Sequence, residues 1–158
     1  RFPDAFLKVS IPEYEYWDKA DPENNTTMMT RIYPKFSAFS PEIFSPDNEA
    51  GYTLVQGVKI TAIPAYGHTP GHVGFLVEKR EGKLLIWGDT THAINFQIPH
   101  PEVAVTYDTN PEDAIKSRKL LLEYVAENNI LVAGMHIPYP GMGYIKKTED
   151  KGYEFIPL

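Results

Sequence analysis

The alternation of apolar and polar positions predicts a chain rich in strands, with one long helix. Alternating or fully apolar runs typical of strands cover residues 5–11, 52–55, 58–63, 73–78, 84–87, 130–133, 144–147 and 153–156. Turn-forming residues between consecutive runs predict hairpins around positions 56–57, 80–82 and 150–152. This order of elements predicts a mixed α/β fold, in which a sheet packs a helix against one face.

The clearest helical pattern covers residues 111–128. Its apolar residues recur near one face, at Ala114, Ile115, Leu121, Leu122 and Val125. Asn110 can cap its start, and Pro111 suits the first helical position. Residues 12–18 also begin with a proline followed by acidic residues, which predicts a short second helix. Residues 18–50 have no regular pattern, and we interpret them as an ordered excursion around a core, with a functional lid as the less common alternative.

Composition narrows the class of protein. The length of 158 residues fits one domain of ordinary size. The net charge of −6 and the lack of a Lys/Arg run argue against binding to nucleic acid or to an anionic membrane surface. No apolar stretch approaches the roughly 18 residues that span a bilayer. Because the chain has no cysteine, disulfides and thiolate metal sites are excluded.

Residues that could bind a metal or take part in catalysis follow the ends of predicted strands. His68 and His72 follow the strand 58–63, and Pro70 between them predicts a tight loop rather than a helix. A Gly/Pro turn that carries two surface histidines is an equally simple interpretation. We expect these two imidazoles to have different roles.

Two further strands deliver polar residues in the same way. Asp89 follows the buried strand 84–87, and His136 follows the apolar strand 130–133. Alone, Asp89 could cap a turn and His136 could be a structural histidine. Three strand ends that each present such a residue favour a metal site, because imidazole and carboxylate suit Zn²⁺, Mn²⁺ or Fe²⁺. Residues that could orient these ligands are Thr69, Thr90 and His72.

These motifs resemble the metallo-β-lactamase superfamily. The residues that carry the resemblance are Gly67-His68-Thr69-Pro70-Gly71-His72, then Gly88-Asp89, then the late histidine of Gly134-Met135-His136-Ile137-Pro138. Residues 95–103, 134–143 and 151–157 are similar to the methyl parathion hydrolase-like branch, which lies near the acyl-homoserine lactonases.

The resemblance implies a fold and a set of ligands. It implies the C-terminal βα half of a four-layer αββα sandwich, with residues 1–50 as the tail of the first half and 51–158 as the second half of a single domain. Carried over by motif, His68, Asp89 and His136 are metal ligands, and His72 supports the loop. Asp89 bridges two metals and is the expected catalytic residue, which accepts a proton later in the reaction. Trp17 matches an aromatic position near the substrate. His92 and His100 match no ligand position.

The same resemblance implies a function for the parent protein. It implies a hydrolase with two divalent metals, most often Zn and otherwise Mn or Fe, whose bridging hydroxide attacks a lactone, ester or phosphotriester. The family's His-x-His-x-Asp-His loop is absent, so we expect these 158 residues to be a C-terminal part that alone binds metal weakly or not at all and is inactive. A missing N-terminal segment or self-association would cover an exposed apolar sheet face. The alternative is a non-catalytic binding module. The compartment stays open, since such relatives are often exported.

Overall fold

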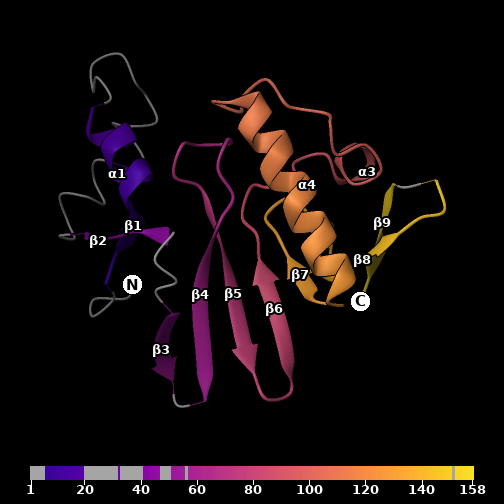
Figure 1. The fold of residues 1–158 in the computed structure, drawn as a ribbon, viewed down its shortest axis with the longest axis horizontal. Helices are drawn as coiled ribbons and strands as arrows, with labels where there is room; N and C mark the ends of the chain where they lie inside the picture. The colour runs from indigo at the N-terminus through magenta and orange to yellow at the C-terminus, as the bar shows by residue number, and fades with distance from the viewer. Residues whose placement is uncertain (1–5, 20–31, 33–40, 47–50, 56, 151) are drawn as a thin grey trace. The chain divides into compact units, whose positions relative to one another are not determined.

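The computed structural model describes residues 6–19, 32, 41–46, 51–55, 57–150 and 152–158 (Figure 1). The chain divides into two compact units, Arg1–Ser45 and Pro46–Leu158. The boundary falls near the position at which the strand pattern of the sequence becomes regular. Most of the irregular excursion 18–50 lies outside the described residues.

The N-terminal unit contains β1 (Lys8–Ser10), α1 (Ile11–Asp18) and β2 (Glu42–Phe44). β1 pairs in parallel with β2. The predicted strand 5–11 is shorter than its pattern because Ser10 already caps α1, accepting a hydrogen bond from the Glu13 N–H at 3.4 Å. Within α1 the Trp17 indole is largely buried and its Nε1 donates to Glu13 Oε1 at 2.7 Å.

The C-terminal unit is built on a seven-stranded sheet. Its strands, in spatial as well as chain order, are β3 (Gly51–Val55), β4 (Val58–Pro64), β5 (Val73–Lys79), β6 (Gly82–Ile86), β7 (Leu131–Ala133), β8 (Met142–Lys147) and β9 (Tyr153–Pro157). All neighbours are antiparallel except β6 and β7. The three predicted hairpins are therefore confirmed.

The parallel pair β6 and β7 requires a long crossover, because parallel strands cannot be joined by a tight turn. The crossover contains the four-residue helix α3 (Ile94–Gln97) and the long helix α4 (Pro111–Glu127), which runs along the sheet (Figure 1). α4 is the helix predicted at 111–128, and the Asn110 side chain caps it by accepting from the Asp113 N–H. The sequence pattern did not predict α3, which is too short for a helical period.

The core lies between α4 and one face of the sheet. Leu122 and Val125 of α4 are fully buried, as are Leu85 and Val132 of the sheet. Burial of each such side chain contributes about 1.5–3 kcal/mol. Alternation along the strands places other apolar residues on the opposite face, where Ile86 is 43% exposed.

Candidate metal centre

Strand direction explains why the three predicted strand-end residues meet. β4 and β6 are both antiparallel to β5, and β6 is parallel to β7, so all three strands end at the same edge of the sheet. The loops that follow them carry His68, Asp89 and His136 respectively. Open sheets commonly form their sites at this edge.

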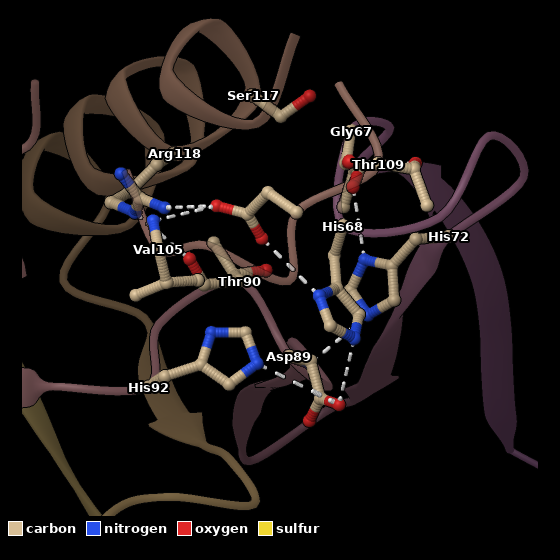
Figure 2. Close-up of polar contacts among 12 residues, drawn as sticks. Gly67, His68, His72, Asp89, Thr90, His92, Val105, Thr109, Ser117 and Arg118 are labelled. Carbon is tan, nitrogen blue, oxygen red and sulfur yellow. Dashed lines mark hydrogen bonds and ion pairs between the residues drawn. The ribbon is translucent and has the colours of Figure 1, made fainter. Parts of the chain in front are cut away.

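Asp89 lies at the centre of the cluster. His68 Nε2 lies 3.3 Å from Asp89 Oδ2, and His136 Nε2 lies 3.6 Å from Asp89 Oδ1. The two carboxylate oxygens therefore face two different imidazoles, as Figure 2 shows for His68. About a third of the Asp89 side chain is exposed, so the cluster is open to solvent.

His92 joins the cluster, although its motif matched no ligand position. Its Nε2 lies 3.9 Å from Asp89 Oδ2, and His68, Asp89 and His92 each offer a ligand atom within 4.8 Å of the others. Its ring centroid is 4.7 Å from those of His68 and His136. One indication in the sequence that His92 belongs to the cluster is that it lies three residues after Asp89 in the same loop.

Burial controls the charge of His92. The side chain is 5% exposed, and its pKa is lowered to about 4, with burial as the largest cause. The neighbouring His68 and His136 contribute to this lowering of the pKa, whereas Asp89 and Asp108 oppose it. His92 is therefore a neutral imidazole at physiological pH, which is the form that can bind a metal or donate one hydrogen bond.

A buried carboxylate orients His68 from behind. Asp108 Oδ1 lies 3.2 Å from His68 Nδ1, and the Asp108 side chain is 1% exposed. The Val105 N–H donates to its other oxygen at 3.2 Å. With Nδ1–H donating to Asp108, the Nε2 lone pair of His68 is directed at the cluster, an arrangement common among metal-binding histidines. Sequence reasoning proposed Thr69 and Thr90 for this role and missed Asp108.

His72 positions the backbone of Asp89. Its Nε2 accepts from the Asp89 N–H at 2.9 Å, and its Nδ1–H donates to the Ala65 carbonyl at 2.9 Å. Both ring nitrogens are thus engaged by the protein, which suits a supporting residue rather than a ligand. Gly88 permits the contact, because a Cβ there would lie 2.6 Å from His72 Nε2.

Thr90 and Thr69 each form a hydrogen bond to a backbone group within their own loop. Thr90 Oγ1 donates to the Trp87 carbonyl at 2.6 Å, and the Thr69 carbonyl accepts from the Gly67 N–H at 3.0 Å. These bonds shape the loops that carry Asp89 and His68. Direct contact of either threonine with a metal ligand stays a prediction.

The beginning of α4 holds the His68 loop. The Asn110 N–H donates to the Gly67 carbonyl at 2.9 Å, and the Thr109 N–H donates to the His68 carbonyl at 3.1 Å. Ser117 Oγ donates to the Tyr66 carbonyl at 2.8 Å. Gly67 has φ +123°, and a Cβ there would lie 2.0 Å from the Ala114 backbone nitrogen. The loop and the helix fit together only with glycine at this position.

Tyr107 borders the cluster, and sequence reasoning did not single it out. Its ring packs edge-on at 4.8 Å from His92 and 6.2 Å from His68, and it is 57% exposed. His100 instead pairs with Glu102 at 3.6 Å outside the cluster. Trp17 belongs to the N-terminal unit, and its place near a substrate stays a prediction. Among the described residues, no helix is long and apolar enough to cross a membrane.

Comparison with known proteins identifies the fold. No family model and no curated protein matches the sequence. Among solved structures, the chain is similar to the hydrolase AbOPH of the β-lactamase superfamily, with a TM-score of 0.80 and 26% identity over 99% of this chain and 56% of that one. It is similar to AidC, a dizinc quorum-quenching lactonase, with a TM-score of 0.80 and 24% identity over 99% of this chain and 56% of AidC.

A third solved structure is a probable metal-dependent hydrolase from Staphylococcus aureus. It gives a TM-score of 0.67 and 16% identity over 99% of this chain and 53% of that one. The chain thus spans little more than half the length of these structures. Over that length, the chain has the fold of the metallo-β-lactamase superfamily hydrolases, which confirms the resemblance seen in its motifs.

Proposed function

We propose that this chain is part of a metal-dependent hydrolase and contributes His68, Asp89, His92 and His136 to its metal centre. The observation that carries the proposal is the convergence on Asp89. One carboxylate oxygen faces His68 and His92, and the other faces His136. A carboxylate with a different imidazole on each side is suited to bridging two cations.

The donor set fits a divalent metal such as zinc. Imidazole nitrogens and a carboxylate oxygen are common zinc ligands, and no thiolate is needed. Three ligand atoms already lie within 4.8 Å of one another. His68 has a buried carboxylate behind it, which is the arrangement that fixes the ring of a metal ligand. Mn²⁺ and Fe²⁺ accept the same donors.

The chain's own residues have distinct tasks in this proposal. When bound, the metals supply Lewis acidity and lower the pKa of a coordinated water. Asp89 presents its two oxygens to both sides of the centre. His92 stays neutral, so its Nε2 lone pair, close to Asp89, is free to serve as one of these metal donors. The exposed ring of Tyr107 offers an apolar face next to His92.

The substrate class follows from the chemistry of the site and from the relatives. A lactone, another carboxylic ester and a phosphotriester all present an electrophilic centre with an oxygen that acquires charge. AidC is described as a lactonase and was solved with N-hexanoyl-L-homoserine, and AbOPH is described as a hydrolase. We therefore propose a small ester or lactone as substrate. The four donors of this chain require ligands from elsewhere to hold two metals, so we propose that the 158 residues alone are inactive.

Asp89→Asn in the full-length protein tests this function. We expect loss of one or both metals by mass spectrometry and a fall in lactone or ester hydrolysis of at least about 100-fold, because the amide cannot bridge two cations. Glu102→Gln is the matched control, since this exposed carboxylate lies outside the cluster. An Asp89→Asn protein that keeps its metals and its turnover would remove Asp89 from the centre.

A further inference from the structure

Arg118 is a buried cation inside the helix that covers the sheet. It lies on α4 with 1% of its surface exposed, among the apolar residues of the same helix face. Burial lowers its pKa, whereas the neighbouring Asp108 raises it. A buried guanidinium is unfavourable unless its donors are satisfied, so its partners indicate why this position carries a charge.

Three of those partners are backbone carbonyls of the crossover. Arg118 Nε donates to the Thr90 carbonyl at 2.9 Å, and Nη1 donates to the carbonyls of Pro101 and Val103 at 2.9 and 2.8 Å. Thr90 directly follows Asp89. The planar guanidinium therefore joins the loop that carries Asp89 to the segment that leads to Asp108.

The fourth partner links Arg118 to the cluster. Arg118 Nη2 lies 3.9 Å from Asp108 Oδ2, and the other oxygen of Asp108 faces His68 Nδ1 at 3.2 Å. Both the Arg118 and the Asp108 side chains are 1% exposed. Arg118 and His68 thus contact different oxygens of Asp108, and Figure 2 shows these two labelled side chains apart from each other.

We propose that Arg118 is a positioning residue of the metal centre. It holds the Asp108 carboxylate against His68, so that His68 keeps its proton on Nδ1 and its Nε2 lone pair stays free to bind a metal beside Asp89. Through Thr90 it holds the Asp89 loop at the same time. Arg118 itself touches neither Asp89 nor His68, so its effect is on their orientation.

The first test is the tautomer of His68 in the metal-free protein, measured by long-range proton–nitrogen NMR in mildly alkaline buffer. In the wild type we expect the Nδ1–H form. Arg118→Met should give a mixture with the Nε2–H form, and Arg118→Lys should give a smaller change in the same direction. Leu122→Ala is the control, because it removes a fully buried side chain of the same helix and should leave the tautomer unchanged.

The second test is the affinity of the full-length protein for zinc alone, measured by competition with a chromophoric chelator. This test rests on the proposed function, whereas the tautomer test does not. We expect zinc binding about 10–100-fold weaker in Arg118→Met, because orienting partners of metal ligands typically contribute this much. Wild-type protein that binds no zinc would refute the proposed function and leave the tautomer result to decide the role of Arg118.

The outcomes separate a positioning role from a purely structural one. A folded Arg118→Met protein with the wild-type His68 tautomer would overturn the proposal. A Leu122→Ala protein that shows the shift toward Nε2–H expected of Arg118→Met would also overturn it. If Arg118→Met does not fold, Arg118→Lys decides. A wild-type tautomer in that variant overturns the proposal, and a shift toward Nε2–H supports it.

Discussion

Gly67 is where the His68 loop and the first turn of α4 come closest. Its φ of +123° is a conformation that residues with a Cβ rarely adopt. A Cβ there would lie 2.0 Å from the Ala114 nitrogen and 2.4 Å from its Cα, both backbone atoms of the helix. Gly67→Ala therefore has two physical effects, strain at the substituted residue and displacement of the loop from α4.

The magnitude of each effect can be worked out separately. A non-glycine residue at positive φ costs about 1–3 kcal/mol. Forcing extra volume into a packed position adds about 1–3 kcal/mol. Gly57→Ala isolates the first effect, because Gly57 has φ +79° and nothing within 4 Å of the added Cβ. We expect Gly67→Ala to lower the free energy of unfolding more than Gly57→Ala does, and the difference should be at least about 1 kcal/mol.

Equilibrium denaturation of both variants, followed by fluorescence and circular dichroism, measures this difference. The displaced loop carries His68, so the zinc affinity of the full-length protein should also fall in Gly67→Ala and stay unchanged in Gly57→Ala. Equal losses of stability in the two variants would show that the loop does not pack on α4 as described. If Gly67→Ala is destabilised but its zinc affinity is unchanged, the position of the His68 loop does not affect metal binding.

Two further predictions concern pH and association. The folded pKa of His92 is about 4, below its ordinary value of 6.5, so the unfolded state binds more protons between these values. The contribution of His92 to stability is complete above pH 6.5 and is lost as the pH falls toward 4. In the metal-free wild type we expect His92 to lower the free energy of unfolding by about 1–3 kcal/mol as the pH falls from 6.5 toward 4. This decrease should be absent in His92→Gln and present in the control His100→Gln. Denaturation at several pH values measures it, and an identical pH dependence in His92→Gln would contradict the neutral, buried state of His92. The apolar sheet face that carries Ile86 should drive self-association of the 158-residue chain, and Ile86→Glu should reduce it. Analytical ultracentrifugation checks this, and a wild-type chain that stays monomeric at high concentration would refute it.

The sequence by itself determined the strands of the seven-stranded sheet, the helices α1 and α4, and three of the candidate ligands. Strand and helix periods are local properties, so the hairpins and α4 followed from hydrophobic spacing and turn residues. His68, Asp89 and His136 could be selected because each follows an apolar run and a small or turn-forming residue. Their motifs also indicated the superfamily that the structural comparisons confirm.

The tertiary structure decided which side chains complete the site. Asp108 faces His68 across 40 positions of sequence, and Arg118 reaches Thr90 across 28. These contacts exist because the crossover between the parallel strands β6 and β7 folds α4 back over the sheet. The spacing of apolar residues cannot predict such contacts, because residues 98–108 show no helical or strand periodicity. Local pattern could therefore place the ligands at strand ends, but only the packing of the crossover could show what orients them.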